Sequence, residues 1–321
     1  MQVTVQRLTS RDRAHLGELW HAATDARRRG LGLDDLPPGE GSALDRPGAF
    51  GVGVFDGRSL VAAAVALPAL ADDGRGEDPI AGLAHVSSVA TDPTRWGRGL
   101  GRRVVGGIEL QAMRRGFARA QLWTYTSNSA SRHLYESVGY TLSGRAKIDD
   151  HGEASVHYWR ELTAPVQAPR PAARLICVDP QGRVLLLKWR DPSDGHVLWE
   201  PPGGGLEPGE AVRDAVLREW AEETGLPAPE VVGALTTVAR DLLWNGHRYV
   251  AEEHFLLAYA GSAGCPDTSA QTEFEAACYL GHDWVHWSAL GGLADPVEPE
   301  LLPVLRRLDP HGAWRTQLPR P

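Results

Sequence analysis

Strand-like and helix-like patterns alternate along the first half of the chain. Short runs of alternating or continuous apolar residues predict strands at 2–8, 51–55, 59–67, 84–90 and 120–125. Apolar residues at helical spacing predict helices at 12–29, 101–115 and 129–137. Asp56-Gly57 is a strong hairpin signal, and Gly116 is the expected end of the second helix. The Asp- and Gly-rich stretch 70–82 is predicted to be a surface loop.

The second half repeats this alternation. Apolar runs predict strands at 174–178, 183–190, 231–239 and 254–259. A loop rich in Gly and Pro at 200–209 leads into a helix that ends near Thr224, where Gly225 terminates it. A last helix is expected at about 299–308. Strands that alternate with helices in both halves indicate the α/β class.

A proline-rich segment divides the two halves. Three prolines fall within the eight residues 164–171, and proline favours extended backbone at its own and the preceding position. A stiff, extended linker is the simplest interpretation. We therefore expect a first domain at 1–163, a linker at 164–171 and a second domain at 172–321, a division that suits a chain of 321 residues.

Charge is unevenly divided between the halves. Residues 1–165 carry 20 Lys and Arg against 19 Asp and Glu, whereas residues 166–321 carry 13 against 22. An acidic second half argues against nonspecific nucleic-acid binding there. It suits a site that gathers cations, or it is simply a solvated acidic surface.

Other features exclude several protein classes. No apolar run approaches the roughly 20 residues that span a bilayer, and the first residues lack the pattern of a signal peptide. Three cysteines, Cys177, Cys265 and Cys278, form neither a disulfide framework nor a zinc spacing. The expectation is a soluble, reduced, cytoplasmic protein that binds no membrane.

A carboxylate cluster stands out in the second half. Glu219, Glu222 and Glu223 are spaced i, i+3 and i+4, so a helix places all three on one face. Three like charges so close repel one another, and a hard divalent ion such as Mg²⁺ or Mn²⁺ would compensate them. Arg218 can pair with Glu210 or Glu222. The alternative is a solvated acidic helix face.

The surrounding residues match a known motif. The segment resembles the Nudix box, G-x5-E-x7-R-E-U-x-E-E-x-G-U, in which U is a bulky aliphatic residue. Its seven fixed letters fall on Gly204, Glu210, Arg218, Glu219, Glu222, Glu223 and Gly225. Trp220 departs from the usual Ile, Leu or Val but keeps the position apolar.

The resemblance implies a fold and a reaction. It implies a Nudix α/β/α sandwich that hydrolyses a nucleoside diphosphate-linked substrate with Mg²⁺ or Mn²⁺. It implies that Glu219, Glu222 and Glu223 are metal ligands and catalytic residues together with Arg218. Gly204, Glu210 and Gly225 would shape the loop–helix–loop. The general base differs within the family and is left unassigned.

Residues outside the box allow two interpretations each. Glu252, Glu253, Glu273 and Glu275 are extra ligands or bases, or ordinary surface residues. Lys188 and Arg190 share one face of a strand. They are either phosphate-binding residues or ordinary solvated strand residues. Trp244, Arg248 and Tyr249 form a base-stacking loop, or a hairpin with aromatic packing.

A second constellation lies in the first half. The segment 91–101 carries glycines at 97, 99 and 101 between a strand and a helix. Such a loop exposes backbone N–H groups, and the helix N-terminus adds partial positive charge, so the loop can hold a pyrophosphate. Further on, Asn128 precedes a short helix with Tyr135, followed by Val138-Gly139-Tyr140.

Together these elements resemble the GNAT acyl-CoA N-acyltransferases, and the resemblance covers residues 1–163. It implies a GNAT-like mixed-sheet domain that uses acetyl-CoA as co-substrate. The residues expected to bind the cofactor are Gly97, Arg98, Gly99 and Gly101 at its pyrophosphate and Asn128 at its pantetheine arm. Tyr135 would protonate the departing thiolate, or it packs in the core. His85 would deprotonate an amine, or is structural. The departures are Thr91, Trp96 and Ser131.

The sequence therefore favours a bifunctional enzyme. Its expected partners are a small nucleotide-type substrate and an amine acceptor, with no nucleic acid. Two alternatives stay open: a catalytic Nudix half joined to a CoA-binding sensor, and a non-enzymatic ligand-binding regulator. The identities of the nucleotide and the amine, and the oligomeric state, are also open.

Overall fold

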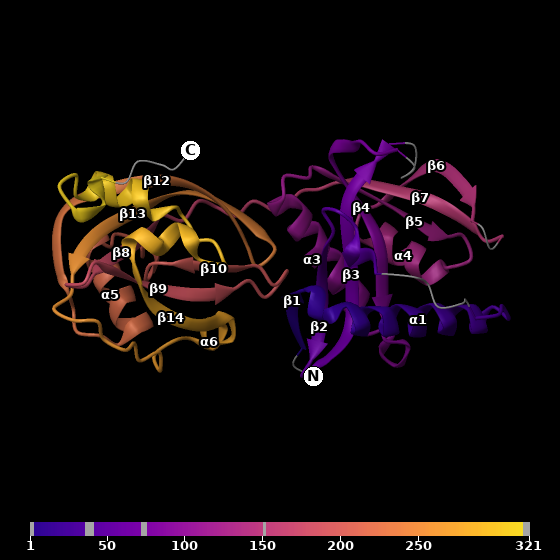
Figure 1. Cartoon of the computed structure of the whole chain (residues 1–321), viewed down its shortest axis with the longest axis horizontal. Coiled ribbons are helices and arrows are strands. Elements are labelled where there is room, and N and C mark those ends of the chain that lie inside the picture. The colour runs from indigo at the N-terminus through magenta and orange to yellow at the C-terminus, as the bar shows by residue number, and fades with distance from the viewer. Residues whose placement is uncertain (1–2, 36–41, 72–75, 150–151, 317–321) are drawn as a thin grey trace. The chain divides into compact units, whose positions relative to one another are not determined.

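The computed structural model describes residues 3–35, 42–71, 76–149 and 152–316. The chain divides into two compact units, one formed by Met1–Pro165 and Pro192–His196 and the other by Val166–Asp191 and Val197–Pro321 (Figure 1). Each unit contains one sheet of seven strands. Within the described part of the chain, no helix has the length and apolarity needed to cross a membrane.

The first unit is built on a mixed sheet with the order β1-β2-β3-β4-β5-β7-β6. Its strands are β1 (Val3–Arg7), β2 (Phe50–Asp56), β3 (Ser59–Leu70), β4 (Pro79–Thr91), β5 (Arg119–Tyr125), β6 (Thr141–Ile148) and β7 (Ala154–Glu161). Its helices are α1 (Arg13–Gly30), α3 (Leu100–Arg114) and α4 (Ser129–Ser137), with short 3-10 turns at Ser10–Asp12, Ala43–Asp45 and Pro93–Arg95. β4 and β5 run parallel, and the other neighbours are antiparallel. This confirms the expected mixed-sheet α/β fold.

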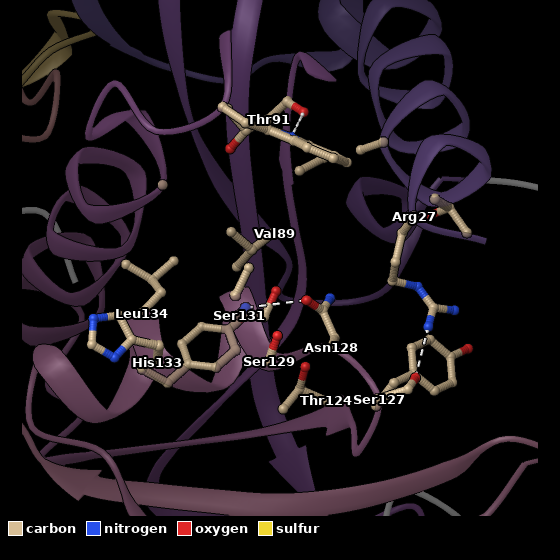
Figure 2. A pocket seen from close by; sticks show the side chains of 18 of the residues that line it. Arg27, Val89, Thr91, Thr124, Ser127, Asn128, Ser129, Ser131, His133 and Leu134 are labelled. Atoms are coloured by element: carbon tan, nitrogen blue, oxygen red, sulfur yellow. Dashed lines mark hydrogen bonds between the residues drawn. The ribbon is translucent and has the colours of Figure 1, made fainter. Parts of the chain in front are cut away.

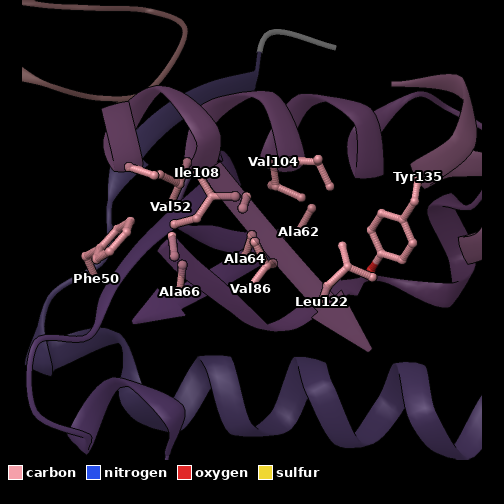
Figure 3. Close-up of a cluster of buried hydrophobic side chains, with 14 of the residues drawn as sticks. Phe50, Val52, Ala62, Ala64, Ala66, Val86, Val104, Ile108, Leu122 and Tyr135 are labelled. Carbon is pink, nitrogen blue, oxygen red and sulfur yellow. The ribbon is translucent and has the colours of Figure 1, made fainter. Parts of the chain in front are cut away.

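Strand β3 has helices against both of its faces. Ala62 and Ala64 belong to the core cluster that includes Val104 and Ile108 of α3 (Figure 3). Ala63 and Val65 belong to a second cluster with Leu16 and Leu19 of α1. Because alternate residues of a strand point to opposite faces, the small side chains of β3 allow helices to approach from both sides.

The sheet opens between β4 and β5. Val65 pairs with Ser88 and Ala66 with Val86, so Ser87 is an extra residue in β4 and makes a bulge. The β4–β5 pairs end at Val86, whereas β5 continues to pair with β7 as far as its last residue. The two parallel strands therefore part on the side where the glycine-rich loop follows β4.

The second unit is an α/β/α sandwich, as expected. Its strands are β8 (Ala172–Val178), β9 (Arg183–Arg190), β10 (Val197–Glu200), β11 (Gly203–Gly205), β12 (Glu230–Trp244), β13 (His247–Tyr259) and β14 (Tyr279–His286). Its helices are α5 (Val212–Thr224), α6 (Glu273–Cys278) and α7 (Leu301–Leu308), with 3-10 turns at Trp287–Gly292 and Ala313–Thr316. The main path runs β10-β9-β8-β13-β12, with β11 paired to β8 and β14 to β9. Leu175 of β8 packs in the cluster with α5, and the next residue, Ile176, packs in the cluster with α7.

Several elements differ from the sequence prediction. The pattern did not predict β6, β7, β10, β11, β14 or α6, and it made β12 and β13 too short. β6 alternates polar residues with Leu142, Gly144, Ala146 and Ile148, a strand pattern that the prediction missed, although every residue of β6 is exposed. The predicted loop at 70–82 is shorter than expected, because β4 already begins at Pro79; residues 72–75 of that loop lie outside the described residues.

Candidate active sites

The loop before α5 lies against the carboxylate helix. Gly204 pairs with Ala173 of β8, and a Cβ added to Gly204 would lie 2.6 Å from Oε1 of Glu219. Only glycine permits this close approach. At the other end of α5, Gly225 has the left-handed backbone conformation (φ 60°) that the sequence predicted for the terminating residue.

The three carboxylates of α5 have different surroundings. Glu219 and Glu223 are buried, whereas Glu222 is exposed. Arg218 reaches all the acidic groups beside it: its guanidinium lies 2.9 Å from Glu210, 2.8 Å from Glu219 and 3.3 Å from Glu222. Its hydrogen bonds hold the pKa of Glu210 at about 2. Arg218 thus fixes the orientation of the carboxylate face.

Glu223 lies below this surface. Its Oε2 accepts a hydrogen bond of 2.8 Å from the backbone N–H of Gly203. Burial raises the pKa of Glu223 well above its usual value and also raises that of Glu219. Burial thus disfavours the charged form of both carboxylates, and a nearby cation would favour it.

A buried ion-pair network lies next to Glu223, and the sequence did not predict it. Arg174 of β8 contacts Glu253 (2.5 Å) and Glu200 (2.8 Å), and Arg240 contacts the other oxygen of Glu253 (2.7 Å). Burial raises the pKa of Glu200 to about 7. Glu253 is therefore neither a surface residue nor a free ligand, because both of its oxygens bind arginines.

The remaining candidates have structural partners. Glu275 caps α6 by accepting the Thr272 N–H (2.8 Å), and Lys188 pairs with Asp295 (2.9 Å). Trp244 packs against the cluster around Trp189, which favours the interpretation of aromatic hairpin packing. Arg248 likewise pairs with Asp241. Among the described residues, no three His, Cys, Asp or Glu side chains already converge as a group that could hold a metal.

The first unit contains a cavity of about 950 Å³ at the opening between β4 and β5. In Figure 2, His133 and Leu134 of α4 lie on one side of it and Arg27 of α1 on the other. Its lining includes four Arg and Lys side chains and one carboxylate, namely Arg27, Arg95, Arg102, Lys147 and Asp149. Arg27 and Arg95 also pair with Glu153 and Asp56 outside this lining, and the cationic groups that face the cavity suit an anionic ligand.

The glycine-rich loop forms one end of the cavity. Gly97, Gly99 and Gly101 all line it, whereas the exposed Arg98 is not among the lining residues. Gly97 and Gly99 have φ of 77° and 76°, which other residues adopt at a cost. Gly99 is the N-cap of α3, so the first free N–H groups of that helix begin at this loop.

Asn128 and Tyr135 also line the cavity. The Oδ1 of Asn128 caps α4 by accepting the Ser131 N–H at 3.1 Å (Figure 2), which gives Asn128 a structural role as well. Tyr135 is 6% exposed, and its ring packs beside Tyr140 and Tyr158. Burial raises the pKa of the Tyr135 hydroxyl, so it keeps its proton at neutral pH.

The opposite side of the cavity carries groups that the sequence did not suggest. Tyr125 donates to Asp149 (3.0 Å) and stacks beneath the guanidinium of Arg27 (4.2 Å to the ring centre), which also binds Glu153. His85 is not among the lining residues, and burial lowers its pKa to about 4. The geometry therefore gives His85 no place beside a ligand in this cavity.

Comparisons with known proteins divide the chain in the same two parts. Residues 168–308 match the model of the NUDIX domain, and residues 34–140 match that of the acetyltransferase (GNAT) family. An RNA pyrophosphohydrolase from Novosphingobium aromaticivorans is 33% identical over 147 residues, which are 42% of this chain and 81% of the relative. One from Erythrobacter litoralis is 30% identical over 143 residues, 41% of this chain and 85% of the relative.

Solved structures resemble the chain weakly. The ribosomal-protein-S18-alanine N-acetyltransferase from Escherichia coli is 17% identical, with 50% of this chain and 95% of that chain covered and a TM-score of 0.39. The GNAT domain of an S. lividans protein is 20% identical, with 49% and 89% covered and the same TM-score. No conclusion rests on likenesses of this size.

Proposed function

We propose, since the chain belongs to the Nudix family and also carries a GNAT acetyltransferase domain, that it is a bifunctional enzyme. The second unit would hydrolyse a phosphoanhydride bond in a nucleoside diphosphate-linked substrate, and the first would transfer an acetyl group from acetyl-CoA to an amine. The observation that carries the first activity is the carboxylate face of α5, ordered by Arg218 and approached closely by Gly204.

The donor set of α5 suits a hard divalent ion. Glu219, Glu222 and Glu223 supply carboxylate oxygens, which Mg²⁺ and Mn²⁺ prefer. The raised pKa values of Glu219 and Glu223 show that burial opposes their negative charge, and a bound cation would favour it. When bound, such ions polarise phosphate oxygens and make a bound water more acidic.

The residues of the chain prepare the site in specific ways. Arg218 holds Glu219 and Glu222 side by side, and the Gly203 N–H orients Glu223. Gly204 lets the loop approach the Glu219 carboxylate without a side chain between them. These contacts restrict the rotamers of the three carboxylates before any substrate arrives, which lowers the cost of ordering the site.

The relatives bear on the substrate. The relatives from Novosphingobium aromaticivorans and Erythrobacter litoralis are named RNA pyrophosphohydrolases, which is in tension with our expectation that the protein acts on no nucleic acid. The acidic composition of the second half argues only against nonspecific binding along a nucleic-acid backbone. We therefore include the 5′-phosphorylated end of an RNA among the phosphoanhydride substrates to be tested, beside small nucleoside diphosphate derivatives.

The cavity of the first unit supports the acetyl transfer. Gly97 and Gly99 line the cavity just before the N-terminus of α3, a position that favours a pyrophosphate, and the cationic lining suits the phosphates of CoA. Tyr135 would donate its proton to the thiolate that leaves. The alternative, a CoA-binding sensor, predicts the same binding without turnover of any amine.

The hydrolase is tested by Glu222→Gln. The change keeps the shape of an exposed side chain and removes its charge, so hydrolysis of nucleoside diphosphate derivatives with Mg²⁺ should fall at least about 100-fold. Folding should be no weaker without metal, because repulsion on α5 is relieved. Asp214→Asn, an exposed acid on the same helix, should leave turnover near normal. Near-normal turnover of Glu222→Gln would sink the assignment.

The transferase is tested by Tyr135→Phe. The ring stays in the core, so the acetyl-CoA affinity measured by calorimetry should change little. Acetylation of an amine library should fall by roughly 10²–10⁴-fold, the usual size of general acid–base assistance. An unchanged rate would leave Tyr135 a packing residue, and unmutated protein that binds no acetyl-CoA would reject the transferase altogether.

A further inference from the structure

The buried side chain of Arg174, on β8, contacts four polar partners. Its Nε–H donates to Glu253 (2.5 Å) and its Nη2 lies 2.8 Å from Glu200. Its Nη1 donates to the carbonyl oxygens of Pro201 (3.0 Å) and Gly203 (3.3 Å). An arginine has five N–H donors, and Arg174 uses them on four partners. The residue is only 8% exposed, so these contacts are shielded from water.

Arg174 donates to the 201–203 backbone, and the same segment donates a hydrogen bond to Glu223 of α5. Gly203 accepts from Arg174 through its carbonyl oxygen, and its N–H donates to Glu223 at 2.8 Å. Gly203 also pairs with Arg174 in the β11–β8 register, and the Leu175 N–H donates to Pro202 (2.9 Å). A shift of residues 201–203 would therefore move the donor that orients Glu223.

Other charged groups hold Arg174 in place. Glu253 of β13 binds Arg174 with one oxygen and Arg240 of β12 with the other. Glu200, at the end of β10, binds the guanidinium next to the prolines of the loop. The network thus spans β8, β10, β12 and β13. Within it, Arg174 is the side chain that donates to the 201–203 backbone.

We propose that Arg174 is a positioning residue of the hydrolase site: its guanidinium fixes the 201–203 backbone, and so fixes the Gly203 N–H that orients Glu223 for metal binding. This rests on the proposed hydrolysis. The geometry of the guanidinium matters more than its charge, because one planar fork reaches two carboxylates and two carbonyl groups. A lysine keeps the charge but has three donors on one atom and cannot reach all four partners.

The conservative change Arg174→Lys separates the two roles. We expect Mn²⁺, titrated into the full-length protein by calorimetry, to bind about 10- to 100-fold more weakly, the usual cost of losing a group that orients a metal ligand. In hydrolysis with Mg²⁺ held saturating, kcat should fall at least 10-fold, whereas KM should change less than about 3-fold, because a side chain that is only 8% exposed offers substrate little direct contact.

Arg183→Lys is the matched control. Arg183 pairs with the buried Asp179 at 2.7 Å in the same sheet, at the turn between β8 and β9. The Arg183→Lys variant should have the same Mn²⁺ affinity and kcat as the unmutated protein. Where Arg174→Lys lowers the melting temperature, the double change Arg174→Met with Glu200→Gln removes the Arg174–Glu200 pair and leaves Glu253 paired with Arg240. Stability should then be restored without restored Mn²⁺ affinity.

The outcomes are distinct. Mn²⁺ affinity and kcat in Arg174→Lys equal to those of the unmutated protein would overturn the positioning role. So would recovery of Mn²⁺ affinity in step with the melting temperature in the double variant, since that would show only a structural role. If the unmutated protein neither binds Mn²⁺ nor hydrolyses any phosphoanhydride, the proposed hydrolase itself fails.

Discussion

Three buried carboxylates, Glu223, Glu253 and Glu109, have different kinds of partner. Glu223 accepts a backbone N–H, and Glu253 lies between two arginines. Glu109 of α3, in the first unit, lies 3.2 Å from Arg160. Burial outweighs that arginine and raises the pKa of Glu109 to about 7. Burial likewise raises the pKa of Glu223, so their hydrogen-bond donors do not offset the desolvation of either carboxylate.

The raised pKa of Glu109 predicts a pH dependence of stability. Between about pH 4.5 and 7 the folded state keeps a proton that the unfolded state has lost, so protons favour folding. This contribution is complete below pH 4.5 and is lost as the pH rises through 7, at a cost of about 3 kcal/mol. The variant Glu109→Gln has no such loss.

Denaturant unfolding of both proteins at several pH values checks this prediction. The unfolding free energy of Glu109→Gln minus that of the unmutated chain should rise from pH 5 to pH 8. Because the two proteins share every other titrating group, those contributions cancel in the difference. A difference that is constant with pH would mean that Glu109 is already ionised in the folded state.

At the scale of elements, α3 shows how one helix contains two kinds of glycine. Gly99 caps the helix with a left-handed backbone, and Gly106 lies within the helix. A Cβ at either position meets no atom within 4 Å. Substitution therefore tests backbone conformation alone, free of steric clashes.

We expect opposite effects from the two substitutions. Gly99→Ala should destabilise the protein by about 1–2 kcal/mol, because an L-residue is strained there, and should weaken acetyl-CoA binding by displacing the loop N–H groups. Gly106→Ala should stabilise it by about 0.5–1 kcal/mol and leave binding unchanged. Thermal unfolding measures the change in stability, and acetyl-CoA calorimetry measures the change in affinity. If both substitutions changed the affinity equally, the Gly97–Gly101 loop would not be part of the acetyl-CoA site.

Most elements with a regular side-chain pattern were predicted from sequence, with β6 an exception, and those without one were not. The helix spacing of Glu219, Glu222 and Glu223 located the carboxylate face, because 3.6 residues per turn is a local rule. β11 consists of three glycines and offers no pattern. Arg174 looked like an ordinary strand residue, because its partner Glu253 is 79 residues away along the chain. The role of each carboxylate, and the domain limits, stay predictions.

At the scale of the whole molecule, the apolar cores are separate. The clusters of the first unit use residues between Val5 and Leu162, and those of the second use residues between Ala173 and Trp314. A unit with its own core can fold by itself. The acidic surplus of residues 166–321 accordingly belongs to the hydrolase half.

Separate cores predict that the fragments 1–165 and 170–321 each fold. The second should keep metal-dependent hydrolysis. The first lacks residues 192–196 of its unit, so we expect it to melt at a lower temperature than the full chain. Circular dichroism and calorimetry check both. If neither fragment folds, the domain boundary does not lie at residues 165–170.

The parting of β4 from β5 gives one strand two edges of different character. From Ser88 to Thr91, β4 still pairs with β3, while its pairs with β5 have ended at Val86. Amide hydrogens that point toward β3 should therefore exchange slowly with solvent deuterium, and those of the alternate residues, which point into the opening, quickly. An extended ligand lying along the free edge would slow only the second set, so protection that changes at every other residue of β4 would record its presence and the length of strand that it covers.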